Sequence, residues 1–460
     1  MGHREPQRRG RGGLALAVAT ALCLPAAGGA LLQLPPESEG EAIAYRTSRP
    51  TDPVARLAED LEAGRASLAW SGKNGYLSAL LQALGVPASS QMLVFSKTSF
   101  QRELIAPHTP RAIYFNDDVY VGWVPGGRVV EISAADPRLG GTFYALDQRR
   151  SSRPRIARQT DECLQCHESA LTRGVPGHVI RSVFSDPSGA PILSAGSYVT
   201  THESPLEERW GGWYVTGTHG SQRHLGNQVF RSAAQAARPS LDAGANVTDL
   251  RKRFDSTRYL TPHSDIVALL VAEHQTHVHN LIARAGYGVR AALHSERMLN
   301  RELGRPESHR SESTAGRIRA SVEPLVRGLL FSGEAPLAAP VRGTSGFAGE
   351  FARRGPRDSR GRSLRDLDLA RRLFRHPCSY LIYSRAFDGL PPEAREQVYR
   401  RMWDVLEGRD TGAEWAHLTQ YDRDSIRAIL LETKPEFARF RPEASVRPAP
   451  TSAPEAARAR

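Results

Sequence analysis

The feature that most constrains the fold is a change of hydrophobic periodicity along the chain. Between about 91 and 148 the apolar residues form short β-branched or aromatic runs, including QMLVFS, VYVGWV and TFYAL. Asn116, Asp117, Gly126 and Gly127 lie between such runs, and these residue types favour the tight turns of β-hairpins. We therefore predict an antiparallel sheet over 91–148.

After about residue 255 the apolar residues recur at helical spacing. The segment 264–286 begins with Ser264 and Asp265, good N-cap residues, and meets a glycine at its end, which predicts a helix that stops near Gly286. Further helices are predicted over 51–64, 76–85, 317–333, 363–377, 391–408 and 422–435. The expected fold class is α+β, with an antiparallel sheet region first and a mainly α-helical C-terminal half.

The N-terminus is typical of a signal peptide. A basic segment with four arginines precedes the apolar stretch LALAVATALCLPAAGGA, and cleavage is expected near Ala30. The apolar stretch is short for a membrane span and no later segment resembles one, so we expect no stable span after cleavage. An uncleaved N-terminal anchor is the alternative. The expected location is periplasmic or secreted.

Charge constrains the partners. The chain carries a net charge of +12, and about +9 remains without its first thirty residues. Because no lysine or arginine run is interleaved with aromatic residues, we expect no nucleic-acid binding. A basic surface suits an acidic redox partner protein.

The clearest chemistry lies in the segment DECLQCHESA, which contains a C-x-x-C-H motif. Two thiols separated by two residues can form thioether bonds to the vinyl groups of one haem, and the adjacent histidine can bind its iron. Cys163 and Cys166 would therefore hold one covalent haem c, with His167 as the proximal iron ligand. Covalent attachment takes place outside the cytoplasm, in agreement with the signal peptide.

Three other interpretations of the motif stay open. A structural zinc site needs about four ligands, and the chain has no second cysteine pair. A thioredoxin-like dithiol follows a strand in a βαβ unit, whereas the preceding RPRIARQTDE does not resemble a strand. The motif can also be an accident. Signal cleavage would remove Cys23, and Cys378 is expected to be a buried apolar thiol.

The second face of the iron has no obvious ligand, because Met298 and Met402 lie far beyond the spacing of a small cytochrome c. His274 and His277 share one face of the predicted helix 264–286 and are candidate distal ligands. A polar helix face that holds neighbouring loops is the alternative. With His219 and His224 they could also enclose a second metal. A carbonyl, for which we expect that of Pro176, would orient a haem histidine.

These predictions divide the chain into five segments. They are a signal peptide at 1–30, a mixed α/β region at 31–150, a c-type haem segment with hairpins at 151–254, a helical region at 255–440 with a long loop at 334–362, and a disordered tail at 441–460.

The chain resembles a family of largely uncharacterised secreted bacterial proteins with one c-type haem motif. The resemblance runs from about Leu93 to Pro435. The segments that carry it are SFQRELIAPHTPRAIYFNDDVYVGWVPGG, CLQCH, ERWGGWYVTGTHG, EHQTHVHN, HPCSYLIYS and DRDSIRAILLETKP. It implies a periplasmic haem protein, with the motif at Cys163, Cys166 and His167, but no particular reaction.

Two functions follow from these expectations. The first is periplasmic electron transfer by an exported c-type cytochrome, favoured if two strong protein ligands bind the iron. The alternative is a peroxidase- or oxidase-like haem enzyme with an open distal site, favoured by the length of the chain and its clustered histidines.

Overall fold

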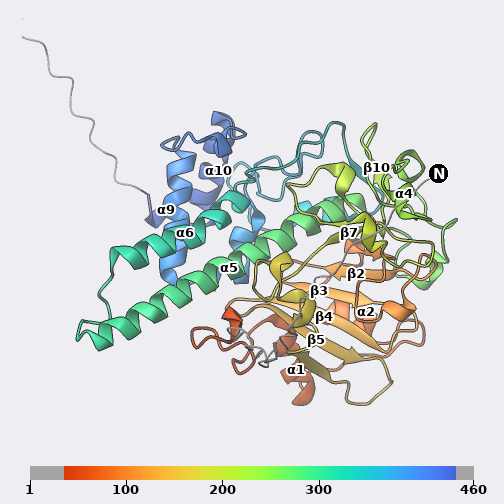
Figure 1. The fold of residues 1–460 in the computed structure, drawn as a ribbon, viewed down its shortest axis with the longest axis horizontal. Coiled ribbons are helices and arrows are strands. Elements are labelled where there is room, and N and C mark those ends of the chain that lie inside the picture. The colour runs from red at the N-terminus through yellow and green to blue at the C-terminus, as the bar shows by residue number, and fades with distance from the viewer. Residues whose placement is uncertain (1–35, 442–460) are drawn as a thin grey trace, which may run out of the picture. The chain divides into compact units, whose positions relative to one another are not determined.

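A seven-stranded antiparallel sheet forms the N-terminal part of the computed structural model, which describes residues 36–441 (Figure 1). The strand order is β6-β5-β4-β3-β2-β1-β9. The strands are β1 (Met92–Val94), β2 (Arg111–Phe115), β3 (Val119–Trp123), β4 (Val129–Asp136), β5 (Gly140–Asp147), β6 (Ile156–Gln159) and β9 (Trp213–Tyr214). The predicted sheet is confirmed, as is the α+β fold class. The predicted signal peptide and most of the predicted tail lie outside the described residues.

The expectation that no strand precedes the C-x-x-C-H motif was wrong. Strand β6 pairs with β5, Ile156 opposite Leu146 and Gln159 opposite Phe143. Four residues that look like a basic linker gain a strand conformation because the edge of β5 offers unpaired backbone groups. All pairings in this sheet are antiparallel, so the strand does not belong to a thioredoxin-like βαβ unit.

Two short helices cover one face of the sheet. Helix α1 (Pro53–Glu62) begins where Asp52 accepts hydrogen bonds from the amides of Val54 and Ala55, and α2 is Leu77–Ala83. Apolar residues of both helices form one core cluster with alternate strand residues such as Tyr114, Val121 and Ile132. Both helices were predicted and are confirmed.

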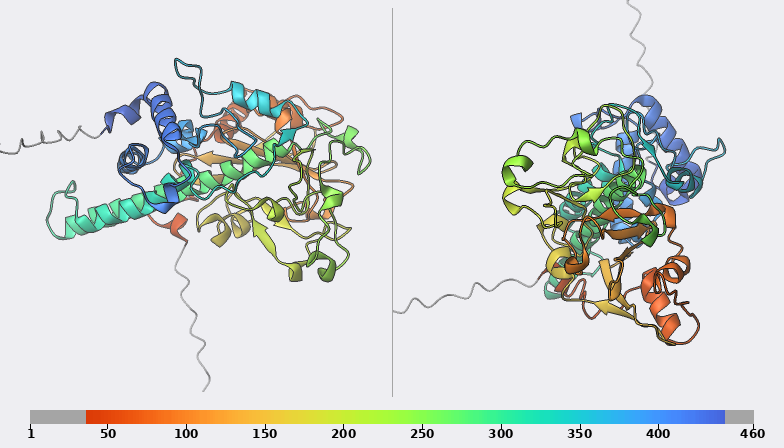
Figure 2. Two further views of the ribbon diagram at one scale, coloured as in Figure 1. Left: turned by 90° about the horizontal axis from the view of Figure 1, so that it is seen from above. Right: turned by 90° about the vertical axis from the view of Figure 1, so that its right-hand side faces the viewer.

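The other face meets α5 (Ile266–Glu302), a helix of 37 residues that extends from the sheet to the C-terminal helices (Figures 1 and 2). The prediction that this helix stops near Gly286 was wrong. Gly286 and Gly288 lie inside the helix, and a β-carbon at Gly288 would overlap with the Ser321 side chain of α6 (Glu312–Leu329). Gly288 therefore allows α5 to pack closely against α6, and neither glycine ends the helix.

The helices after α6 share one core cluster with α5, α6 and the sheet. They are α7 (Phe347–Arg353), α8 (Arg385–Asp388), α9 (Pro392–Leu406), α10 (Gln420–Thr433) and α11 (Pro435–Arg439). Helices α6, α9 and α10 were predicted. Helix α7 and strand β11 (Arg342–Gly343) lie within the stretch expected to be a long loop. In the part of the chain that the structure describes, no helix is long and apolar enough to span a bilayer.

The predicted helix at 363–377 does not form. Asp368 uses its carboxylate to accept hydrogen bonds from the amides of Ala370 and Arg371, which closes a turn instead. Leu369 has a φ of 57°, and Leu367 pairs with Phe374 in an isolated bridge. Local side-chain hydrogen bonds thus compete successfully with a helical apolar pattern.

The segment between the sheet and α5 contains short elements that frame the motif. Strands β7 (Arg181–Val183) and β8 (Ser197–Val199) form the predicted hairpin, and β10 (Gly217–Thr218) pairs with β11. The short helices of this segment include α3 (Leu164–His167), α4 (Ala233–Ala236) and the 3-10 helix η4 (Ala170–Thr172).

Candidate functional site

The C-x-x-C-H residues occupy a single helical turn. Cys163 is the N-cap of α3, and its carbonyl accepts a hydrogen bond from the His167 amide at 3.0 Å. Leu164, between the cysteines, is 7% exposed and packs in a small core cluster with Tyr45 and Tyr287. Because this spacer residue points inward, Cys166 is exposed and Cys163 is half-buried. Both thiols are free.

The imidazole of His167 has a defined orientation. Its Nδ1 lies 2.9 Å from the carbonyl oxygen of Gly177, and the Gly177 amide donates to the His167 carbonyl at 2.8 Å. A carbonyl can only accept, so Nδ1 carries the proton and Nε2 keeps its lone pair. Burial lowers the pKa of His167, which keeps the ring neutral although the bond to Gly177 opposes the shift. Nε2 is therefore the nitrogen available to an iron.

The orienting carbonyl belongs to Gly177 and not, as expected, to Pro176. The Pro176 carbonyl instead accepts a hydrogen bond from the Gly141 amide at 2.7 Å. This contact ties the segment after the motif to the beginning of β5, so the next carbonyl along the chain faces His167.

A partly exposed area of the sheet lies beside the motif. Gly122, Glu131 and Ala145 are cross-strand neighbours on one face, and the Arg111 guanidinium lies over Gly122, where a β-carbon would overlap with it. Arg111 pairs with Glu131, yet its buried Nε has no partner. Burial, with a contribution from Glu131, raises the pKa of Cys163 to about 11. The thiol is therefore protonated, unlike that of a reactive dithiol.

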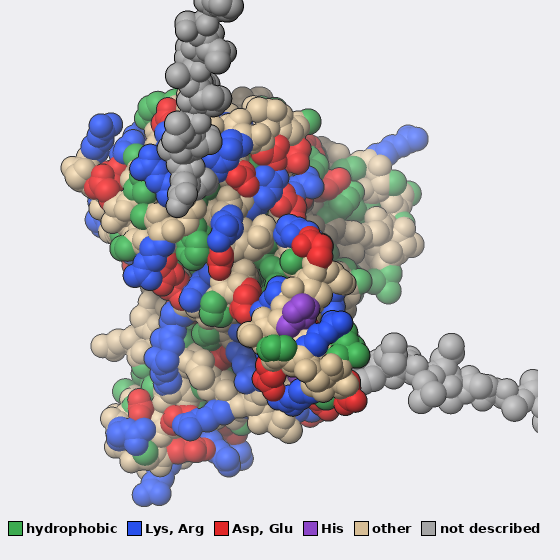
Figure 3. Space-filling view, turned by 90° about the vertical axis from the view of Figure 1, so that its left-hand side faces the viewer, with side chains coloured by type: hydrophobic (Ala, Val, Ile, Leu, Met, Phe, Trp, Pro, Cys, Tyr) green, Lys and Arg blue, Asp and Glu red, His purple; other side chains and the backbone are tan. Residues whose placement is uncertain are grey.

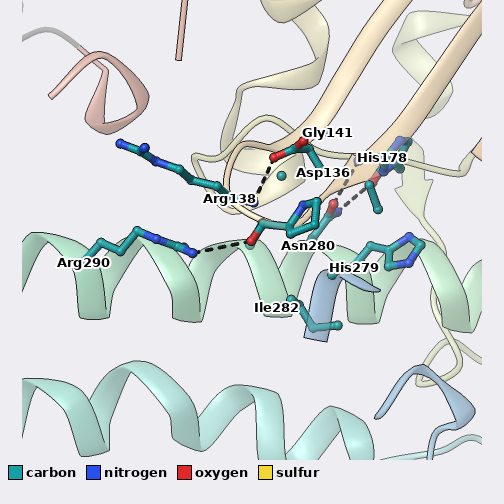
Figure 4. A pocket seen from close by; sticks show the side chains of 13 residues that line it. Asp136, Arg138, Gly141, His178, His279, Asn280, Ile282 and Arg290 are labelled. Carbon is teal, nitrogen blue, oxygen red and sulfur yellow. Dashed lines mark hydrogen bonds between the residues drawn. The ribbon is translucent and has the colours of Figure 1, made fainter. Parts of the chain in front are cut away.

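Helix α5 holds the segment that carries the Gly177 carbonyl, the group that orients His167. Asn280 accepts a hydrogen bond from the His178 amide at 2.8 Å through Oδ1 and donates to the His178 carbonyl at 2.7 Å through Nδ2. Figure 4 shows Asn280 beside His178, with His279 on the same helix. A β-carbon on Gly177 would overlap with the Asn280 amide, so the close approach requires glycine.

Sequence reasoning missed the histidines nearest to this segment. His178 is 6% exposed and neither ring nitrogen has a partner, while His279 is 4% exposed with Nε2 unpartnered. The Tyr120 ring lies 4.5 Å from that of His178, and the Phe143 ring lies 4.8 Å from that of His167, between ring centroids. The helical pattern does contain a signal for His279. This residue lies five positions after His274, so it faces a different side of the helix from His274 and His277.

The structure places His274 and His277 against His202, and no ring contact or hydrogen bond joins either to His167 within residues 36–441. The Nδ1 atoms of His274 and His202 are 3.2 Å apart, and His274 Nε2 lies 2.7 Å from the Ser379 hydroxyl. Burial lowers the pKa of each of these three histidines.

His219 and His224 form a separate pair with ring centroids 4.8 Å apart. His219 Nε2 accepts from the Asn246 amide and His224 Nδ1 accepts from the Gly226 amide, so both rings fasten their own loop. Among the described residues no three His, Cys, Asp or Glu side chains are arranged to hold a metal ion.

A cavity of about 540 Å³ is lined by residues that include Ala170, three positions after His167 in the chain. Apolar walls come from Leu171, Ile180 and Val199, and His178 and His277 also line it. His277 Nε2 lies 3.7 Å from the Glu203 carboxylate at its rim. The cavity is thus part apolar and part polar, as small-molecule sites are.

The donor set at the motif fits a covalent haem. Two free thiols and an imidazole with an unprotonated Nε2 lie on one turn, beside a guanidinium whose buried Nε has no partner. Comparisons of the chain with family models, curated proteins and solved structures find no match.

Proposed function

We propose that this protein is an exported c-type cytochrome with one covalently attached haem that transfers electrons outside the cytoplasm. The observation that carries the proposal is the bond between His167 Nδ1 and the Gly177 carbonyl, on the same turn as both cysteines. It fixes the tautomer that an iron ligand needs and orients the ring.

Four side chains of this protein would hold the haem. Cys163 and Cys166 would provide the thioether bonds, and His167 Nε2 the proximal bond to iron. Arg111, on the sheet face near the motif, would pair with a haem carboxylate through its unpartnered Nε. The bound haem supplies a one-electron iron couple. The basic chain suits an acidic redox partner; on the face in Figure 3, positive and negative side chains are interspersed.

The test is expression of the whole chain with a haem-attachment system, followed by acid-acetone extraction. We expect the haem to stay with the protein, and the combined substitution of Cys163 and Cys166 by alanine to release it. Cys378→Ala is the matched control, because this thiol is fully buried away from the motif. A colourless wild-type product would refute the proposal.

The cavity lined by Leu171, His178 and His277 favours a second function, that of a peroxidase- or oxidase-like haem enzyme. Its wall begins at Ala170, three residues after His167, and a small substrate would fit within it. A carbon monoxide shift of the reduced spectrum would indicate an open iron and support the enzyme. Spectra of His274→Ala and His277→Ala test the candidate distal ligands, and no change in either would remove both.

A further inference from the structure

The hydroxyl of Tyr120 has an unusual environment. It lies 3.0 Å from His279 Nδ1 and accepts a hydrogen bond from Gln275 Nε2 at 2.9 Å. All thirteen tyrosines lie within the described residues, and Tyr120 is the only one of them whose hydroxyl bonds to a histidine. Its side chain is buried, with the residue 8% exposed.

The direction of the Tyr120 hydrogen bond follows from its neighbours. Gln275 Oε1 accepts from the Tyr380 hydroxyl at 2.6 Å, and Gln275 Nε2 also donates to the Asn116 carbonyl, so the amide nitrogen faces Tyr120. The phenolic proton must then point to the one acceptor within reach, His279 Nδ1. As the acceptor of this bond, His279 Nδ1 carries no proton and has a lone pair that can take one.

A short series of rings connects this pair with the haem motif. The ring centroids of Tyr120 and His178 are 4.5 Å apart, those of His178 and Phe143 are 6.0 Å apart, and those of Phe143 and His167 are 4.8 Å apart. The two intermediate side chains are buried. Tyr120 is therefore within a few ring contacts of the proposed iron ligand.

The surroundings can hold the charge that proton transfer would create. Asp117 and Asp118 follow Asn116 in the turn before β3, and both carboxyls act on the Tyr120 hydroxyl to raise its pKa further than burial alone. A protonated His279 would be a buried cation, and a hydrogen bond to the Asp117 backbone raises the pKa of His279 against the effect of burial. Phenolate formation without oxidation is disfavoured by the same carboxyls.

We propose that Tyr120 is a redox-active tyrosine that gives an electron to the oxidised haem while its proton passes to His279. The proposal rests on the haem at Cys163, Cys166 and His167 with an open iron position, as in the second of the two functions proposed above. In this step the O–H bond of Tyr120 breaks, an N–H bond forms at His279 Nδ1, and one electron passes along Phe143 and His178. The oxidant is a peroxide, which takes two electrons and two solvent protons to become two waters. One electron comes from Tyr120 and the other from the haem.

The test is a freeze-quench reaction of the ferric holoprotein with hydrogen peroxide, observed by electron paramagnetic resonance. We expect a tyrosyl radical whose signal narrows with ring-deuterated tyrosine. Its coupling to a histidine nitrogen should change when histidine is labelled with 15N. Both readouts use the wild-type chain and do not depend on a variant that folds.

Two tyrosine variants localise the radical. Tyr120→Phe keeps the ring and should abolish the signal, whereas Tyr114→Phe should keep it, because buried Tyr114 donates to Gln91 and not to a histidine. His279→Gln removes the proton acceptor, so it should lower the radical yield and abolish the nitrogen coupling of any radical that still forms.

The outcomes separate this proposal from the proposed function. Haem without a radical, a radical unchanged in Tyr120→Phe, or a radical without nitrogen coupling would overturn the tyrosine proposal alone. A chain that never binds haem would overturn both.

Discussion

Asn280 holds the backbone of His178 at both of its polar groups, the amide at 2.8 Å and the carbonyl at 2.7 Å. The preceding residue, Gly177, supplies the carbonyl that orients His167. A side chain of the long helix α5 thus controls the segment that defines the tautomer of the proposed iron ligand. This gives one physical reason for a single C-x-x-C-H motif to be accompanied by a large helical region.

Loss of this clamp, the two hydrogen bonds between the Asn280 side chain and the His178 backbone, should affect stability and the haem together. Asn280→Ala removes two buried hydrogen bonds, so we expect the free energy of unfolding in urea to fall by about 2 kcal/mol. The absorption spectrum of the holoprotein should also change, because the Gly177 carbonyl is no longer held. Asn300→Ala is the control: Asn300 is also buried on α5 and bonds to the His309 carbonyl. An unchanged spectrum in Asn280→Ala would contradict the proposed role of the clamp.

Gly177 should not tolerate a larger side chain. The β-carbon of Gly177→Ala would overlap with the Asn280 amide, and we expect destabilisation of about 2 kcal/mol, as for other overpacked sites. Gly346→Ala is a suitable control because a β-carbon there meets nothing within 4 Å. Thermal unfolding of both variants provides the measurement, and equal melting temperatures would show that the segment simply moves aside.

Thiol accessibility distinguishes the two states of the motif. In protein made without haem attachment, a thiol reagent should modify exposed Cys166 first and Cys163 more slowly, because burial raises the Cys163 pKa to about 11. Cys378 is fully buried with a raised pKa and should react only in denaturant. In the mature holoprotein, both motif thiols should be absent even in denaturant. Two reactive motif thiols in coloured protein would argue against thioether attachment.

Acid should weaken the junction of α5 and α6 through Glu296. Burial would raise the pKa of this carboxyl, but hydrogen bonds from Ser311 and from Arg310 outweigh it and lower the pKa from 4.5 to about 2. A carboxyl with a lowered folded-state pKa stabilises the fold above pH 4.5 and loses that contribution as the pH falls towards 2. The wild type should therefore lose more stability over this interval than Glu296→Gln.

The control for this pH dependence is Glu302→Gln, at the exposed end of the same helix. Urea unfolding at a series of pH values should give parallel curves for this variant and the wild type. A Glu296→Gln curve that also runs parallel to the wild type would show that the Ser311 and Arg310 contacts do not favour the charged form.

The sequence by itself determined what depends on local pattern. Alternating and β-branched runs predicted the sheet, and N-cap residues such as Asp265 predicted helix starts, because these effects act within a few residues. The C-x-x-C-H spacing likewise places Cys163, Cys166 and His167 on one turn whatever the rest of the chain does. Gly286, by contrast, suggested a helix end, whereas the helix continues through it and through Gly288, which packs against Ser321 of the distant helix α6.

Only the tertiary structure decided which side chains meet the motif. Helical spacing placed His274 and His277 on a shared face, but periodicity does not say which face meets which surface, and their neighbour is His202. His178 and His279 lie nearest to the His167 segment because Asn280 and the sheet bring α5 against it. Such contacts join residues about a hundred positions apart, and their geometry depends on how α5 packs on the sheet, which no local pattern contains.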